Sequence, residues 1–366
     1  MILDMNIITA LVGMLLVVLV LWDVFMVLVL TRRATRQFQF TRPLVTLFRR
    51  LYAAVGRGVH DQTRREQYLS VFGPLFLFFR FAVWAAGLIV GFGLLQWAAG
   101  SRIVEPDGSA PFTNILYFSG NTFLTLVLND AVPPQTVLSR FLAIAEAATG
   151  FAFLGLIISY LPAFYQDYAR REVRLSMLDE WAGSPPSAGE LLRRLGQEKA
   201  LSDLNPFLQE WERWSAEVLE SHLSYPVLAF YRSQHENQSW LSALATILDV
   251  SALVLVGIKD IPPRTARLTF AMARHTVVDL GQILGRSLQE SKANRLSSED
   301  FVRLSDLLQL HNVYLANGTA EETKLREFRD LYEPYLISLS EAFSMPLPDW
   351  LPRSGEKDNW LRTAKG

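Results

Sequence analysis

Residues 117–130 read YFSGNTFLTLVLND. They overlap the end of an apolar segment, 111–126, that is too short to cross a lipid bilayer. This segment lies between two much longer apolar runs, 71–99 and 137–165. A helix needs about 20 residues to cross the hydrocarbon core. The order of long, short and long therefore predicts two membrane-crossing helices joined by a re-entrant helix, which enters and leaves the membrane on the same side.

A further apolar run, 7–30, is also long enough to cross. A secretory signal peptide is the competing interpretation of a run so close to the N-terminus. No Lys or Arg precedes this run and no small-residue cleavage pattern follows it, whereas signal peptides have both features. We therefore expect a first transmembrane helix within residues 1–36.

The basic residues indicate how these helices are oriented. The stretch after the third run opens with Arg170, Arg171 and Arg174, whereas the only basic residue in 100–136 is Arg102. Short loops rich in Lys and Arg stay in the cytoplasm. We expect a multi-pass protein of the cell (inner) membrane, with its N-terminus outside, its C-terminus cytoplasmic and the re-entrant segment entering from outside. The arginines of the first loop are Arg32, Arg33, Arg36, Arg42, Arg49, Arg50, Arg57, Arg64 and Arg65.

The linker 37–70 contains a second kind of pattern. Thr41 and Pro43 are suited to the start of a helix. An amphipathic helix here would lie on the inner membrane surface, held by apolar burial and by anionic lipid. A helix that packs on a cytoplasmic domain has the same pattern, so both interpretations stay open. The apolar residues that share one helical face are Leu44, Leu47, Phe48, Leu51, Tyr52 and Val55.

The stretch 117–130 resembles the pore helix and selectivity filter of potassium channels, where a Thr-Val-Gly-Tyr-Gly-Asp run lines the ion path with backbone carbonyls. Thr125 and Asp130 match the two ends of that run, Pro133 follows at the family's usual distance, and Gly150 lies near the gating-hinge glycine of the inner helix. The resemblance covers about residues 71–165, and the extra first helix is similar to bacterial channel homologues. It implies passive ion transport by a homotetramer, with K⁺ or Na⁺ as permeant ions and no cofactor.

The candidate filter departs from that family at its glycines. Val127 and Asn129 replace both of them, and Leu128 stands where an aromatic residue is expected. Glycine lets the filter backbone adopt left-handed dihedral angles, which a β-branched Val adopts only under strain of ~1–3 kcal/mol. We therefore expect potassium selectivity to be weakened or lost. The six candidate filter residues are Thr125, Leu126, Val127, Leu128, Asn129 and Asp130.

Ionisable side chains inside apolar runs are costly, and they are usually paired or functional. Asp23 and Arg80 lie roughly 10 and 14 Å from the cytoplasmic ends of their helices, at 1.5 Å per residue, so they can form an intramembrane charge pair. Two alternatives stay open. Asp23 can face a neighbouring subunit, and Arg80 can extend its guanidinium toward the inner surface.

Two residues of the third run are ambiguous in the same way. Glu146 lies near its middle, where it either lines the ion cavity or supports the filter from behind through Ser119 or Thr122. Gly150 is either a gating hinge or a small residue that allows two helices to approach closely.

Residues 166–366 read as a cytoplasmic helical domain, because helix-start motifs recur and no alternating strand pattern does. The run 241–258 is apolar enough for a fourth crossing. However, Asp249 near its middle would cost ~2.5–3.5 kcal/mol at the bilayer centre, so a buried core helix is favoured over a fourth span. The predicted helix starts are Ser187, Asn205 with Pro206, Pro263 and Thr319.

Composition excludes several classes of function. Cysteine is absent, which removes disulfides, thiolate metal sites and cysteine nucleophiles, and the net charge of −1 gives no basic field for nucleic acid. The five histidines lack metal-ligand spacing, and no phosphate-binding or serine-nucleophile motif occurs, so no enzyme is predicted.

The predicted fold class is an all-α membrane protein with three transmembrane helices, a re-entrant pore helix and a cytoplasmic α-helical domain. Its parts are the first helix 1–36, the linker 37–70, the pore domain 71–165 and the cytoplasmic domain 166–366. The pore domain holds the pore loop 111–130 and the inner helix 137–165. The predicted function is a channel for monovalent cations, and the alternative is a non-conducting, membrane-anchored regulatory subunit. The ligand or partner of the cytoplasmic domain stays open.

Overall fold

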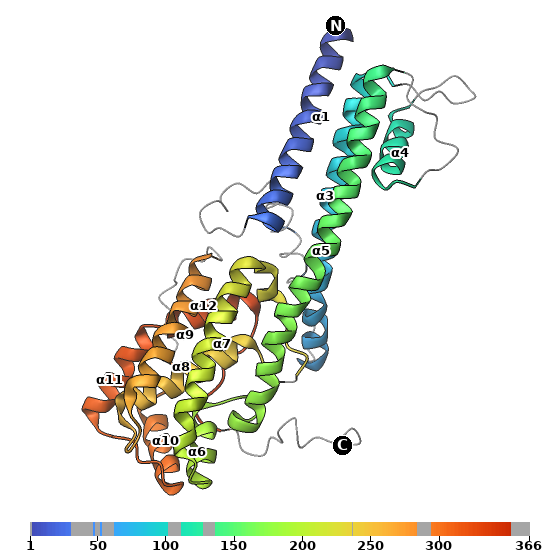
Figure 1. Ribbon diagram of the computed structural model, residues 1–366. Coiled ribbons are helices and arrows are strands. Elements are labelled where there is room, and N and C mark those ends of the chain that lie inside the picture. Colours follow the sequence, from blue (N-terminus) through green and yellow to red (C-terminus); the bar gives the residue numbers. More distant parts are fainter. Residues whose placement is uncertain are drawn as a thin grey trace. The chain divides into compact units, whose positions relative to one another are not determined.

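The computed structural model describes residues 2–30, 47, 52, 62–101, 111–126, 136–235, 237–283 and 294–352. Within these ranges every regular element is a helix, and the one extended pairing is an isolated antiparallel bridge between Ile258 and Leu315 (Figure 1). The expected all-helical class is thus confirmed for this part of the chain. The chain divides into two compact units, Met1–Tyr165 and Gln166–Gly366.

The first unit is built on long apolar helices. Its elements are α1 (Ile2–Val24), the π-helical turn η1 (Phe25–Val29), α3 (Gln62–Ala98), α4 (Phe112–Phe123) and the first part of α5 (Val137–Ala182). Four helices in the described residues are long and apolar enough to cross a membrane, and three of these segments, Met5–Val29, Gln67–Ala98 and Val137–Ala182, begin in this unit. The linker helix predicted within 37–70 lies largely outside the described residues.

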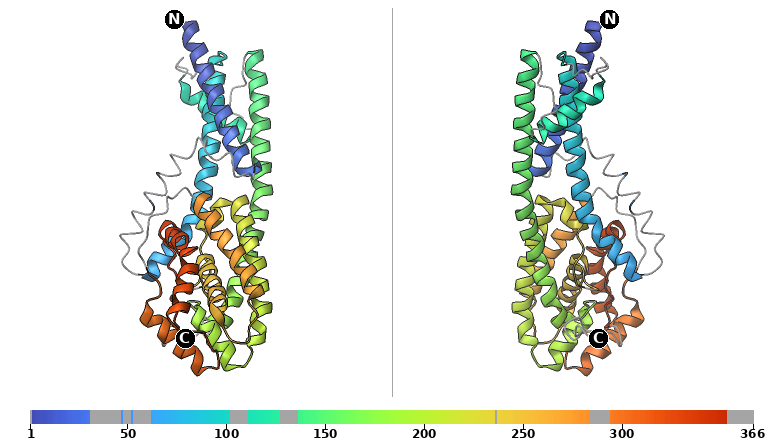
Figure 2. Two further views of the ribbon diagram at one scale, coloured as in Figure 1. Left: turned by 90° about the vertical axis from the view of Figure 1, so that its left-hand side faces the viewer. Right: turned by 90° about the vertical axis from the view of Figure 1, so that its right-hand side faces the viewer.

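Glycines allow α1 and α3 to pack closely, and Figure 2 shows the two helices crossing in both views. A β-carbon on Gly13 would lie 2.9 Å from the carbonyl oxygen of Gly91, and one on Gly91 would lie 2.7 Å from Val17. Gly87 meets Val20 in the same way, one helical turn before Gly91. Small residues four apart are a common contact between membrane helices, because they let two backbones approach.

The inner helix is longer than its apolar run. α5 continues from Val137 without a break to Ala182, past the expected end at residue 165, and it contains Pro162 in its interior. Proline removes one backbone hydrogen bond of a helix and commonly bends it. The single helix is therefore part of both units.

The second unit packs its helices around a buried apolar helix. Its elements are α6 (Ala188–Gln197), η3 (Leu201–Asp203), α7 (Leu204–Ser224), η4 (Pro226–Phe230), α8 (Trp240–Gly257), α9 (Pro263–Ile283), α10 (Ser298–Leu310), α11 (Thr319–Asp330) and α12 (Glu333–Phe343). α8 contacts α6, α7, α9, α11 and α12, and 89% of its apolar window is buried inside the protein. Asp249 on α8 accepts two hydrogen bonds from Arg295 at 2.7 and 3.2 Å and one from the Tyr332 hydroxyl at 2.6 Å.

Three of the four predicted helices begin where expected, whereas the caps predicted at Thr319 and Asn205 are wrong. Ser187 accepts a hydrogen bond from the backbone of Glu190, and α9 begins at Pro263. The cap of α11 is Gly318, whose φ of 142° is available to glycine, and Thr319 is already helical. Asn205 also lies inside α7, since the 3₁₀ turn η3 leads directly into that helix at Leu204. A motif match did not locate these two caps, because backbone conformation decides the cap position.

Candidate functional site in the first unit

The candidate pore helix α4 ends in a compact turn. The Leu126 backbone N–H donates to the Asn121 carbonyl at 3.0 Å, and the Thr125 N–H donates to that of Thr122 at 3.1 Å. This pair of bonds is the Schellman pattern, in which the residue after the helix is left-handed and is usually glycine. Here Thr125 takes that place with φ 53°, and its hydroxyl donates to the Leu124 carbonyl at 2.8 Å.

The turn changes what is expected of the candidate filter. In the family that the sequence resembles, the left-handed glycines correspond to Val127 and Asn129, whereas here a left-handed residue already occurs at Thr125, two residues before Val127. A non-glycine residue in this conformation costs roughly 1–2 kcal/mol. Val127, Leu128, Asn129 and Asp130 lie outside the described residues, so their role in a filter stays a prediction.

One face of α5 packs against α4. Glu146, Gly150 and Phe153 occur at helical spacing, and each contacts the C-terminal half of α4. The Glu146 carboxyl is hydrogen-bonded to the Ser119 hydroxyl of α4 and is fully buried. The Phe153 and Phe123 rings are 5.9 Å apart between centroids.

Gly150 is a point of contact between the two helices. A β-carbon built on it would lie 1.9 Å from the carbonyl oxygen of Phe123, the last residue of α4. No side chain fits there without moving α4 or α5. The structure thus places the candidate hinge glycine in a close helix contact, and α5 is continuous through it.

Asp23 and Arg80 lie next to each other across the contact of α1 and α3. Arg80 Nη2 is 3.8 Å from Asp23 Oδ2, and both side chains are largely buried. Trp84 completes the cluster, because its indole N–H donates to the same carboxylate oxygen at 2.7 Å and its ring lies 4.9 Å from the Arg80 guanidinium. The buried carboxylate thus has a cation nearby and accepts a hydrogen bond from a neutral donor, which lowers the cost of its burial.

The opposite face of α5 is apolar and exposed in the single chain. Phe151 is 75% exposed, and only 17% of the apolar window of α5 is buried. Apolar side chains remain in such a position when lipid or another subunit covers them. The other exposed residues of this face are Val137, Leu138, Phe141, Ile144, Leu154, Leu156 and Ile158.

Three of these features were missed by the sequence interpretation. Trp84 gave no signal, since an indole in an apolar run is usually a packing residue. Gly87 and Gly91 did give one, the spacing of four that is typical of close helix contacts. Pro162 also gave one, because a proline inside an apolar run marks a place where a helix can bend.

A pocket in the second unit and comparisons with known proteins

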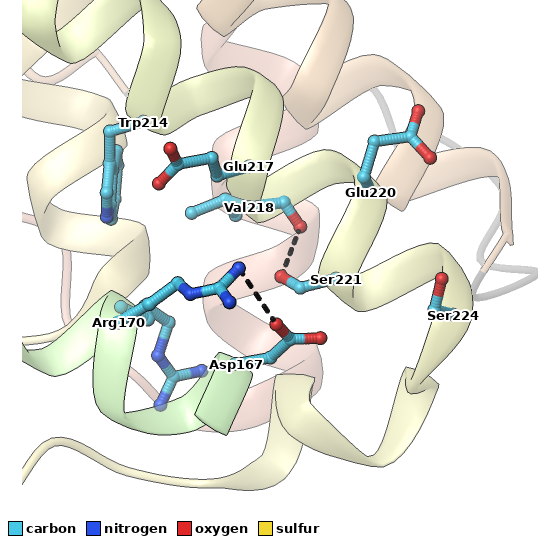
Figure 3. Close-up of a pocket in the computed structure, with 9 residues that line it drawn as sticks. Asp167, Arg170, Trp214, Glu217, Val218, Glu220, Ser221 and Ser224 are labelled. Carbon is cyan, nitrogen blue, oxygen red and sulfur yellow. Dashed lines mark hydrogen bonds and ion pairs between the residues drawn. The ribbon is translucent and has the colours of Figure 1, made fainter. Parts of the chain in front are cut away.

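The second unit contains a small pocket of about 200 Å³ between the C-terminal part of α5 and α7 (Figure 3). Arg170 lies 3.8 Å from Asp167, while Glu217 and Glu220 project from α7 at its rim. Arg171 is buried, forms an ion pair with Glu172 and donates hydrogen bonds to the carbonyls of Leu228 and Tyr231. The carboxylates of Glu217 and Glu220 are exposed at this rim. The lining residues are Asp167, Arg170, Arg171, Trp214, Glu217, Val218, Glu220, Ser221 and Ser224.

A buried histidine lies behind this pocket. His222 Nδ1 is 2.8 Å from the Val218 carbonyl, and Nε2 is 3.4 Å from Arg171 Nη1. Burial and the neighbouring Arg171 charge lower the pKa of His222 to about 3. The ring is therefore neutral, donating from Nδ1 and accepting at Nε2. Among the described residues, no group of three or more His, Asp or Glu side chains could hold a metal ion.

One comparison with known protein families gives a match that lies almost entirely within the first unit. Residues 81–167 match the model of a family described as "Ion channel", and this range holds the C-terminal half of α3, the whole of α4 and the apolar part of α5. The chain is also 23% identical over 198 residues to YdjJ of Bacillus subtilis, described as an uncharacterized membrane protein. That alignment covers 52% of this chain and 56% of YdjJ, so the chain spans about half the length of this relative.

No solved structure matches the chain. The helices, the channel-family match and the membrane-protein relative together define an ion-channel-like membrane protein. A transport function of this kind is non-enzymatic.

Proposed function

We propose that the protein is a cation channel of the potassium-channel type, in which four copies surround a central pore and selectivity for K⁺ over Na⁺ is weakened. The observation that carries this proposal is the short α4, held between α3 and α5 by Ser119, Phe123 and Gly150. A helix of this length cannot cross a membrane, but it can aim its C-terminal end at a pore. The channel-family match over the same helices supports the assignment.

The membrane topology in this proposal has three crossings, by α1, α3 and the apolar part of α5, with α4 as the re-entrant pore helix. α8 is assigned to the interior of a cytoplasmic domain, since it is covered by other helices and its Asp249 is paired. The N-terminus then lies outside and the arginine-rich linker lies inside. The four-fold assembly would cover the exposed apolar face of α5 with lipid and neighbouring subunits.

The cytoplasmic domain would act on the pore through α5. Because α5 is one helix from Val137 to Ala182, a displacement of its C-terminal part is transmitted along the helix, with Pro162 as the place where it can bend. The permeant ions are K⁺ and Na⁺, and no cofactor is required.

The second candidate is a non-conducting subunit that acts as a membrane-anchored regulatory protein. Two observations favour it: the filter glycines are replaced, and Thr125 uses its hydroxyl for the Leu124 carbonyl. In a filter with the family's geometry, the corresponding carbonyls and hydroxyl face the ion.

Ion flux into proteoliposomes distinguishes the two candidates. If the protein conducts, proteoliposomes that contain it take up rubidium and sodium at comparable rates. Protein-free vesicles, or vesicles that contain a non-conducting subunit, take up neither ion. The variant Val127→Gly/Asn129→Gly should raise potassium over sodium permeability, and Val127→Gly alone should contribute more, because Asn tolerates positive φ better than Val. An assembled double variant without any gain in potassium flux would contradict the channel proposal.

A further inference from the structure

The hydroxyl of Ser119 contacts two oxygen atoms, one on each of two other helices. Its Oγ is 2.7 Å from the Ile89 carbonyl oxygen on α3, and it is also in hydrogen-bond contact with Glu146 Oε1 on α5. Ser119 itself belongs to α4, so this one oxygen joins three helices of the first unit. A serine hydroxyl has one hydrogen to donate and two lone pairs that can accept.

The single hydrogen restricts the protonation of Glu146. A backbone carbonyl can only accept, so the short contact with Ile89 is attractive only if Ser119 gives its hydrogen to that carbonyl. The contact between Ser119 and Glu146 then needs a hydrogen that Glu146 supplies. A carboxylate has none, whereas a protonated carboxyl has one O–H. Both contacts are satisfied together only when Glu146 donates to Ser119.

The surroundings of Glu146 favour the same form. The side chain is fully buried, and within the described residues its second oxygen, Oε2, has no hydrogen-bond partner. α4 has no charged residue, and α3 has none after Arg80. The nearest charged residue on α5 is Arg140, about 9 Å away along the helix axis, and the titratable Tyr117 on α4 is half-exposed. Within the described residues, an ionised carboxylate here would lack a counter-ion.

We propose that Glu146 is protonated in this structure and that its proton is the link that holds the inner helix α5 to the pore helix α4 and to α3. Loss of the proton as the pH rises leaves a buried, uncompensated charge and removes the donor to Ser119. The contact between α4 and α5 then loosens, and the pore domain changes state. This regulation rests on the proposed channel function, but the protonation of Glu146 does not.

Infrared spectroscopy of the full-length protein in lipid tests the protonation directly. The wild type should show the carbonyl band of a protonated carboxyl at neutral pH, and this band should disappear on titration to strongly alkaline pH. Glu146→Gln should lack the band, and Ser119→Ala should shift it. Asp23→Asn is the matched control, since it removes a buried carboxylate of the same unit that is paired with a cation and should leave the band unchanged.

Flux measurements at varied pH test the regulation. Wild-type flux should change as the band is lost, and Glu146→Gln, whose amide still donates to Ser119, should make flux independent of pH in that range. A band that is absent at neutral pH, or that survives in Glu146→Gln, overturns the inference. If Glu146→Gln fails to assemble, the expected shift of the band in Ser119→Ala tests the inference independently. A titrating band without any flux retains the protonated Glu146 and refutes the channel function.

Discussion

Gly150 of the inner helix lies directly against the carbonyl oxygen of Phe123, so closely that a β-carbon would lie 1.9 Å from that oxygen. The contact fixes the distance between α5 and the end of α4, and along α5 it lies four residues beyond the Glu146 contact and three before the Phe153 contact. A hinge glycine and a packing glycine both lack a side chain, but they respond differently to alanine. A hinge loses mobility, whereas a packing contact loses stability.

Gly150→Ala should therefore destabilise the first unit, by the ~1–3 kcal/mol that is typical of overpacking. Gly155→Ala is the matched control on the same helix, because a β-carbon there meets nothing within 4 Å. Thermal unfolding in detergent should show a lower Tm for Gly150→Ala and an unchanged or higher Tm for Gly155→Ala. Equal Tm values for both variants would restore the hinge interpretation.

The charge pair of α1 and α3 gives a second prediction. Arg80→Ala leaves the carboxylate of Asp23 buried without its cation, which should cost ~3–5 kcal/mol. Adding Asp23→Asn should recover part of that loss, and Arg64→Ala, an exposed arginine of the same helix, should cost little. Unfolding measurements on the two single variants and the double variant give the coupling energy. Simple additivity would mean that the two residues do not stabilise each other.

The assignment of α8 can be tested by labelling, since the chain has no cysteine of its own. Ser202→Cys lies before α8 and Thr323→Cys lies after it, and both positions are exposed. If α8 is a core helix, both cysteines react with an impermeant reagent from the same side of sealed vesicles. Reaction from opposite sides would make α8 a fourth crossing.

His222 predicts a pH dependence of stability in the second unit. Its pKa is about 3 in the folded protein and about 6.5 in an unfolded chain, so between these values only the unfolded state binds the proton. The free energy of unfolding should therefore decrease as the pH falls from about 6.5, by up to about 1.4 kcal/mol per pH unit from this group. His222→Gln should flatten the dependence of Tm on pH over that range. If the Tm of the wild type and that of His222→Gln depend on pH in the same way, His222 is not the source of the pH dependence.

How much the sequence could predict differs from residue to residue. The proximity of Asp23 and Arg80 was predictable, because helix rise fixes the depth of each residue in its span. The Trp84 donor was not, since nothing in an apolar run tells which way an indole N–H points. The role of Gly150 was left open because close packing and hinge motion require the same absence of a side chain. The left-handed Thr125 was unexpected because glycine is the usual residue there.

During synthesis, α8 leaves the ribosome before three of the helices that will pack on it, α9, α11 and α12. Its partners Arg295 and Tyr332 are not yet made, and Asp249 is then the only charged residue between Trp240 and Gly257. On the scale of the insertion machinery this carboxylate opposes entry into lipid by ~2.5–3.5 kcal/mol. In the topology proposed above, Asp249 therefore first opposes insertion of a membrane-competent segment and later joins α8 to Arg295 and Tyr332 in the folded domain. An apolar substitution there is expected to cause a fault of insertion in the nascent chain, before any folded domain exists to be destabilised.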